Sequence, residues 1–533
     1  MKCHRNPIIP GFNPDPTIAF KDGRYYLATS TFEYFPGVPI YTSVDLVDWT
    51  LIGHALNRRS QLDMRTVECS GGIYAPSLRY NERRKRWYMT AALVLKRSKM
   101  APHDTTPNPT GFYVWSDDIN DETRWSDPIY YDVTGIDQDL FFDEGNGKIW
   151  LSWATGIPDY VAPKGCYNLA VWTVEIDLKT GDSVGEPQLI RQNTSFGNHV
   201  SEGPHVYKRN GYYYLMTAEG GTETEHSEWI FRSKAGPRGP WEDCPHNPLI
   251  YNGQDKHVMQ TGHMDMVEGG DGQWWAVFLA VRNQKGVLSH LGRETFLAPV
   301  EWVEGWPVVN GGRKVSLQGV VGPPRSPNTQ SWTFRFTNDL TKKGWYHLRT
   351  PLKAYHRVEN GHLLLKCGPH ALSQDEAVAM LLQKQTTFNG VWRVEFAFSP
   401  VQMEEEAGIA VWWSKWAYCS VSIRGGKNKA ELVFRKPAEH GDGFEESVWD
   451  APSGTVTIEI KAEPSRYSFY LLSAGARTPL GMMSAHLLVR TRPWDSKFTG
   501  TFLGLFAQGY GGFGTNNLAR FKSVEWQGVL GED

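Results

Sequence analysis

The chain has 533 residues, of which 40% are apolar and 21% charged, and its formal net charge is -3. This length predicts two large domains, or one domain joined to a repeat architecture. There is no basic stripe or polybasic run, so neither a nucleic-acid partner nor a membrane partner is expected. No stretch approaches the ~18 apolar residues of a membrane-spanning helix, and the N-terminal residues lack the apolar region of a signal peptide. We expect a cytoplasmic protein, or a secreted one if a signal peptide has been removed.

The aromatic and cysteine contents narrow the class of protein. Aromatic residues make up 13% of the chain, which suits large β-cores. It also suits sugar binding, because aromatic faces pack against the C–H faces of pyranose rings. The six cysteines are scattered, with no closely spaced pair. In a chain of this size, that argues against a disulfide framework and against a cysteine-based zinc site.

A turn followed by bulky strand residues recurs five times. Four of the five copies carry Asp-Gly or Asn-Gly, the strongest short hairpin signal. Consecutive copies start 61 to 64 residues apart, at Asp22, Arg84, Asn146, Asn210 and Asp271. Five repeats at this spacing predict five four-stranded blades around one axis, a β-propeller over residues 1–320.

The repeat stops after the fifth copy. Residues 320–330 are rich in Pro, Ser and Asn and predict a linker. Short alternating stretches separated by turns follow, as in residues 392–396, 408–412 and 455–460. These predict a β-sandwich over residues 330–533. The predicted fold class is therefore all-β, a five-bladed β-propeller followed by a β-sandwich domain.

Three acids occupy matching places in the repeat. Asp15, Asp137 and Glu202 precede the turn motifs of their own repeats by 7, 9 and 8 residues. Each acid taken alone could be an ordinary turn residue. Together they place three carboxylates at strand starts in three blades, pointing to one end of the axis. Crowding of this kind costs stability and raises the pKa of at least one member, which indicates a catalytic site.

Five motifs connect the chain to a known family. They span residues 11–16, 29–40, 72–76, 202–205 and 291–295. In this order they resemble the β-xylosidases of glycoside hydrolase family 43, and the resemblance extends into the C-terminal sandwich. It implies an exo-acting, inverting β-1,4-xylosidase that releases D-xylose from xylo-oligosaccharides and requires no cofactor.

The resemblance also implies roles for the acids. Asp15 corresponds to the general base that activates water, and Glu202 to the general acid that protonates the leaving oxygen. Asp137 corresponds to the carboxylate that orients Glu202 and raises its pKa. This agrees with inversion, in which a base and an acid act on opposite faces of the sugar.

Six further residues are carried over as substrate-binding candidates. Arg293 matches an arginine that hydrogen-bonds sugar hydroxyls, and Phe32 matches an aromatic residue flanking the sugar. Tyr74 stands where the family has tryptophan, which leaves a smaller platform. The remaining candidates are Trp153, Thr222 and His263. His263 matches an axial histidine that in relatives can lie beside calcium, so a structural Ca²⁺ near His263 is an open alternative.

Other interpretations remain open. The same machinery could act as an α-L-arabinofuranosidase or as a dual xylosidase/arabinofuranosidase, and the remote alternative is a propeller that binds xylan without cleaving it. The C-terminal domain could be a binding module, or it could close the active site through a loop. Residues 506–513, rich in glycine and aromatics, are the candidate for that loop, with a plain turn as the alternative. The sequence leaves open whether the chain forms a homo-oligomer.

Overall fold

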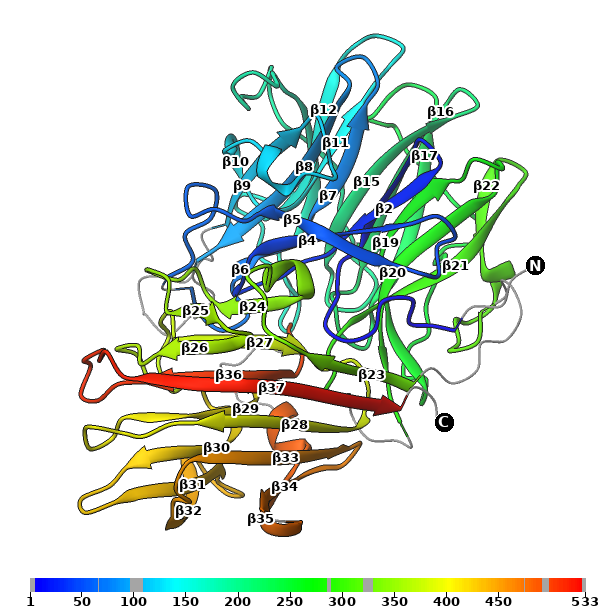
Figure 1. Cartoon of the computed structure of the whole chain (residues 1–533). Helices are drawn as coiled ribbons and strands as arrows, with labels where there is room; N and C mark the ends of the chain where they lie inside the picture. The colour runs from blue at the N-terminus through cyan, green and yellow to red at the C-terminus, as the bar shows by residue number, and fades with distance from the viewer. Residues whose placement is uncertain are drawn as a thin grey trace.

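The computed structural model describes residues 5–65, 67–95, 109–284, 289–319, 329–473, 475–490 and 498–529. Within these ranges the fold is built almost entirely from strands, as predicted. The helices found there are α1 (His486–Val489) and the 3-10 turns η1 (Glu122–Arg124), η2 (Asn310–Gly312) and η3 (Thr341–Lys343). None of these helices has the length and apolar character needed to cross a bilayer. Figure 1 shows a ring of blades stacked on a sandwich of long strands.

Five antiparallel sheets form the propeller, one for each predicted repeat, which confirms the five-bladed arrangement. Blade 1 contains β1 (Thr17–Lys21), β2 (Arg24–Ala28), β4 (Gly37–Ser43) and β5 (Thr50–Leu56). Blade 2 contains β6 (Gly72–Ile73), β7 (Ser77–Asn81), β8 (Arg86–Val94), β9 (Pro109–Ser116) and β10 (Ile129–Thr134), with both β6 and β7 paired to β8.

The other three blades repeat the same order of strands. Blade 3 contains β11 (Ile136–Phe142), β12 (Ile149–Thr155), β13 (Ala170–Glu175) and β14 (Gln188–Arg191). Blade 4 contains β15 (Ser201–Arg209), β16 (Tyr212–Glu219), β17 (Ser227–Ser233) and β18 (Glu242–Asp243). Blade 5 contains β19 (Val258–Glu268), β20 (Trp274–Arg282), β21 (Glu294–Val303) and β22 (Trp306–Val309).

The Asp-Gly and Asn-Gly dipeptides lie where the sequence predicts hairpins. Asp22 and Gly23 connect β1 to β2, both with positive φ (50° and 76°). This backbone matches the twist of the strands that it joins. The first strands of neighbouring blades, β1, β7, β11, β15 and β19, contact one another around the axis. Residues at the starts of these strands are therefore gathered at one end of the ring.

The N-terminal segment closes the ring against blade 5. The Asn6 side-chain amide donates a hydrogen bond to the Leu297 carbonyl (3.0 Å). The backbone of Ile8 donates to the Thr295 carbonyl (2.9 Å). Joining the two ends of the propeller in this way holds the first and last blades at a fixed spacing.

Two sheets pack face to face in the C-terminal domain. One contains β23 (Thr329–Phe334), β25 (His356–Glu359), β26 (His362–Lys366), β28 (Asn389–Ala397), β33 (Thr455–Glu463), β34 (Arg466–Ser473), β35 (Ala476–Ser484) and β37 (Leu518–Val529). The other contains β3 (Tyr34–Phe35), β24 (Trp345–Leu348), β27 (Met380–Lys384), β29 (Glu406–Ser414), β30 (Ala417–Gly425), β31 (Ala430–Pro437), β32 (Phe444–Asp450) and β36 (Phe502–Gln508). Their inner faces form the largest apolar core of the described residues, around Trp392 and Trp526.

The sandwich is joined to one side of the propeller. Strand β3, from the blade 1 region of the chain, pairs with β24 of the sandwich. Arg349 donates to the Val67 carbonyl between blades 1 and 2, and Arg282 of blade 5 donates to the Thr386 carbonyl (2.8 Å). These contacts come from blades 1, 2 and 5. The predicted linker falls largely on residues 320–328, outside the described ranges, so the exact domain boundary stays a prediction.

Candidate active site

Four inner strands share an unusual backbone at one end of the axis. Asp15, Asp137 and His263 have positive φ values of 53°, 58° and 54°, and Gly203, directly after Glu202, has 56°. In β11, β15 and β19 the pairing register shifts at this point. Such bulges re-aim side chains, and non-glycine residues with positive φ cluster at functional sites. We call Asp15, Asp137 and Glu202 the acid ring.

Asp15 is buried and held through both of its carboxylate oxygens. Ser30 donates its hydroxyl to Oδ2 of Asp15, and Arg293 Nη1 donates to Oδ1 (3.0 Å). The arginine is itself buried. This carboxylate therefore has a fixed orientation and a charged partner.

Asp137 and Glu202 interact through strand β15. The backbone N–H of Gly203 donates to Oδ2 of Asp137 (3.0 Å), which ties Asp137 to the residue after Glu202. Burial raises the pKa of Glu202 to about 8, and the charges of Asp137 and Asp15 contribute further to the rise. Burial also raises the pKa of Asp137, against the lowering effect of His263. At neutral pH the Glu202 carboxyl therefore keeps its proton.

Arg293 links three parts of the site. Besides Asp15, its Nη1 donates to Thr222 Oγ1 of blade 4 (2.9 Å), and its Nη2 donates to the carbonyl of Phe498 in the sandwich (3.1 Å). The guanidinium lies 5.4 Å from the ring centroid of Phe32 and 5.3 Å from that of Phe498. The Arg293 guanidinium is therefore buried, and it directs its donors at the corner of the site formed by Asp15 and Thr222.

Aromatic rings from both domains form a wall beside this arginine. The Phe32 ring centroid lies 4.9 Å from that of Tyr74 and 5.7 Å from that of Phe498. Tyr74 is half-buried, and its hydroxyl donates to the Ser70 carbonyl (3.1 Å). The wall therefore contains two predicted residues and one that sequence reasoning missed.

Among the described residues of the sandwich, Phe498 reaches the site, and residues 506–513 form the plain turn of the two interpretations rather than the closing loop. Strand β36 continues to Gln508, and the Gly509 N–H donates to the Gly368 carbonyl within the sandwich (2.7 Å). The turn from Tyr510 to Phe513 closes on itself. Glycine and aromatic content mark a turn in either case, and no signal distinguishes Phe498 from the other phenylalanines of the chain.

The pattern of Glycosyl hydrolases family 43 matches residues 4–307, and that of the Beta xylosidase C-terminal Concanavalin A-like domain matches residues 333–527. The chain belongs to glycoside hydrolase family 43. It is therefore a glycoside hydrolase that acts on carbohydrates, and not a propeller that only binds them.

Relatives within family 43 are named as arabinofuranosidases, as xylosidases, or as both. The non-reducing end alpha-L-arabinofuranosidase BoGH43B of Bacteroides ovatus is 34% identical, over 97% of this chain and 93% of the relative. A xylosidase/arabinosidase of Butyrivibrio fibrisolvens is 32% identical, over 96% and 97%. The crystal structure of a xylan beta-1,4-xylosidase from Bacillus halodurans superposes with a TM-score of 0.88 at 29% identity, covering 98% of this chain and 100% of that one.

The remaining predicted residues are His263 and Trp153. His263 is the blade 5 counterpart of the acids, and its ring lies against Gly203. Trp153 is 2% exposed in the core of blade 3, where its Nε1 donates to the Thr134 carbonyl (3.1 Å). Trp153 thus supports the turn that leads into Asp137.

The donor set around His263 does not fit a metal ion. Across the described ranges, no group of three or more His, Cys, Asp and Glu side chains is arranged to hold one. The His263 ring lies against Gly203 and near Asp137, whose pKa it lowers. We therefore derive no step through calcium.

A second ring lies beneath the acid ring along the same strands. Arg79 forms ion pairs with Asp139 (2.8 Å) and Asp265 (2.9 Å), and its Nη2 lies 2.8 Å from Nδ1 of His205. Thr17 donates its hydroxyl to Asp265 (2.7 Å). These five residues come from five different blades, and we call them the paired ring.

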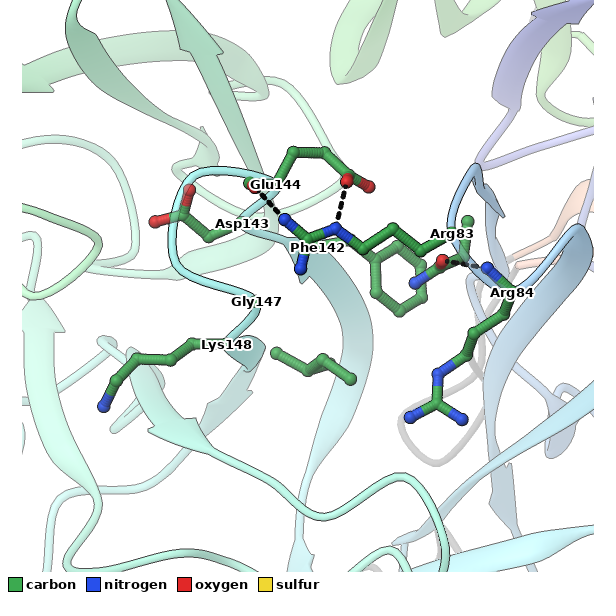
Figure 2. Close-up of a pocket in the computed structure, with 9 residues that line it drawn as sticks. Arg83, Arg84, Phe142, Asp143, Glu144, Gly147 and Lys148 are labelled. Carbon is green, nitrogen blue, oxygen red and sulfur yellow. Dashed lines mark hydrogen bonds and ion pairs between the residues drawn. The ribbon is translucent and has the colours of Figure 1, made fainter.

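A depression of about 290 Å³ lies at the opposite end of the blades (Figure 2). It is formed by the hairpin turns that join β7 to β8 and β11 to β12. Arg83 donates to both Glu144 Oε2 (2.9 Å) and the Glu144 carbonyl, so its charge is already satisfied. The depression contains no member of the acid ring.

Proposed function

We propose that this family 43 enzyme is an exo-acting, inverting β-1,4-xylosidase that releases D-xylose from the non-reducing end of xylo-oligosaccharides. One observation carries the proposal. Three carboxyl groups from three blades meet at one end of the axis, and they differ in state. Glu202 has its pKa raised to about 8, while Asp15 is paired with the Arg293 guanidinium. A protonated acid and an ionised base are the two groups that inversion requires.

The reaction follows from these states. Asp15 takes a proton from a water molecule whose oxygen attacks the anomeric carbon. The bond between that carbon and the leaving oxygen breaks, and Glu202 donates its proton to that oxygen. Asp137 keeps Glu202 protonated through its charge and anchors the strand beside it. Each step uses a carboxyl group of the acid ring.

The surrounding residues are proposed to bind the sugar. Arg293 and Thr222 offer a charged donor and a hydroxyl at one corner, where sugar hydroxyls would replace or extend their mutual contact. Phe32 and Tyr74 offer aromatic faces, and His263 and Trp153 support the floor. Phe498 covers one side of the site from the sandwich, as expected of a pocket that accepts the end of a chain rather than its middle.

A second candidate, α-L-arabinofuranosidase or dual activity, is favoured by the names of the Bacteroides and Butyrivibrio relatives. The test is a comparison of kcat/KM on 4-nitrophenyl β-D-xylopyranoside and 4-nitrophenyl α-L-arabinofuranoside. We expect the xyloside to be the better substrate. A higher value for the arabinofuranoside would replace the proposed substrate and leave the roles of the acid ring unchanged.

A further inference from the structure

The sandwich covers the acid ring unevenly. Its contacts to the propeller come from blades 1, 2 and 5, through β3, Arg282 and Phe498 among others. Glu202 belongs to blade 4. A proton donor must lie within hydrogen-bond reach of the leaving oxygen. The part of the substrate beyond that oxygen is therefore directed towards blades 3 and 4, on the side away from the sandwich.

A structured loop of blade 3 lies on that side. It joins β12 to β13 over residues 156–169, at the same end of the blade as Asp137. The Asn168 side chain holds it together: the amide donates to the carbonyls of Ile157 (2.8 Å) and Tyr160 (3.2 Å) and accepts from the Ile157 N–H (2.8 Å). The loop is therefore fixed by its own hydrogen bonds.

The same loop is hydrogen-bonded to the segment that leads into Glu202. The Tyr167 N–H donates to the Asn198 carbonyl (2.9 Å), and the Ser201 N–H donates to the Leu169 carbonyl (3.1 Å). Asn198 precedes Glu202 by four residues, which span at most about 14 Å of chain. These hydrogen bonds therefore attach the Tyr167 backbone to the segment that leads into the proton donor, within the length of a short oligosaccharide.

Two large side chains of this loop face solvent. Tyr167 is 59% exposed and Val161 is 88% exposed. An aromatic ring with a hydroxyl offers both a face for stacking and a polar edge, which is the combination that a pyranose ring accepts.

We propose that the loop over residues 156–169 is a binding platform for the leaving-group end of the oligosaccharide, with Tyr167 stacking on a sugar beyond the cleaved bond. The inference rests on the proposed function of the acid ring, because it takes the orientation of the substrate from Glu202. It adds a sugar-binding site in blade 3 to the pocket for the released sugar.

The test compares two substrates on the Tyr167→Ala variant. Xylotetraose extends beyond the cleaved bond, whereas the leaving group of β-D-xylosyl fluoride is a single atom. We expect kcat/KM on xylotetraose to fall about tenfold, the effect of one lost aromatic stacking contact. On the fluoride it should stay within about twofold of the wild-type value. Tyr167→Phe should keep wild-type values on both substrates, because the ring remains.

A matched control is Tyr130→Ala, which removes a 51% exposed tyrosine from the edge strand β10 of blade 2. This variant should keep the wild-type kcat/KM on both substrates. An unchanged value on xylotetraose for Tyr167→Ala, or equal losses on both substrates, would overturn the platform. If the wild type releases no xylose from either substrate, the proposed function is wrong. The platform would then be tested by measuring the kcat/KM of Tyr167→Ala relative to wild type on an arabino-oligosaccharide and on arabinofuranosyl fluoride.

Discussion

The acid ring and the paired ring lie two or three residues apart on the same inner strands, yet their carboxyl groups behave in opposite ways. In the acid ring, burial raises the pKa of both Glu202 and Asp137. In the paired ring, burial alone would raise the pKa of Asp139 and Asp265, but the Arg79 guanidinium and His205 together outweigh it, and the pKa of both is lowered. The sequence provides the same residue types at both levels, and the countercharge decides their state.

This comparison separates two uses of buried charge. A carboxylate with a bidentate cation beside it is ionised and joins the blades together. A buried carboxyl whose neighbours include two other acids can hold a proton at neutral pH. The propeller therefore places a layer of paired charges and a layer of proposed catalytic acids at neighbouring positions of one repeat.

The largest effect is expected from removing members of the acid ring. Asp15→Ala and Glu202→Ala should each lower kcat/KM on xylobiose by about a thousandfold. On 2,4-dinitrophenyl β-D-xylopyranoside, whose leaving group departs without a proton, Glu202→Ala should recover much of this loss. Asp15→Ala should not, because the water remains unactivated. Equal losses for the two variants on both substrates would show that the acid and base roles are wrong.

Removing the cation of the paired ring should affect stability instead. Arg79→Met leaves Asp139 and Asp265 buried without their partner, so we expect the free energy of unfolding at pH 7 to fall by about 3–5 kcal/mol. The control is Arg83→Met, which breaks the exposed ion pair with Glu144 and should cost less than about 1 kcal/mol. Urea unfolding of both variants measures the difference.

The pH dependence of this loss has a defined sign. In the wild type the lowered pKa values of Asp139 and Asp265 contribute stability above about pH 4, which is lost as the pH falls. Without Arg79, burial raises these pKa values above those of the unfolded chain, so protonation relieves the penalty. The stability gap between Arg79→Met and wild type should narrow from pH 7 towards pH 4. A constant gap would show that the loss comes from packing and not from charge.

A smaller change beside the paired ring, at a partner of Asp265, should leave the activity unchanged. Tyr207 donates its hydroxyl to Asp265 (2.6 Å) and accepts the Met266 N–H (3.0 Å). Tyr207→Phe should lower the free energy of unfolding by about 1–3 kcal/mol without moving the pH profile of kcat/KM. A displaced pH profile would mean that the two rings are electrostatically coupled. It would contradict the separation of the paired ring from the acid ring.

The sequence predicts the acid ring because its members precede a recognisable turn by similar distances of 7 to 9 residues. It predicts the blades for the same reason, since four of the five hairpin turns carry Asp-Gly or Asn-Gly, which tolerate positive φ. The paired ring is harder to predict because Arg79 and Asp139 meet across blades, and their contact depends on the strand register. Phe498 comes from the other domain, and no local pattern connects a phenylalanine in the sandwich to a pocket in the propeller.

The most direct test of the account is the pH dependence of kcat/KM for the wild type and for Asp137→Asn. With its pKa raised to about 8, Glu202 should lose its proton, and the wild type its activity, on a basic limb near that pH. Asparagine keeps the shape of Asp137 and removes its charge, so the pKa of Glu202 should fall and the basic limb should move to lower pH by roughly one unit. If the limb stays where it is in the wild type, the charge of Asp137 does not control the proton donor, and the proposed division of labour within the acid ring is contradicted.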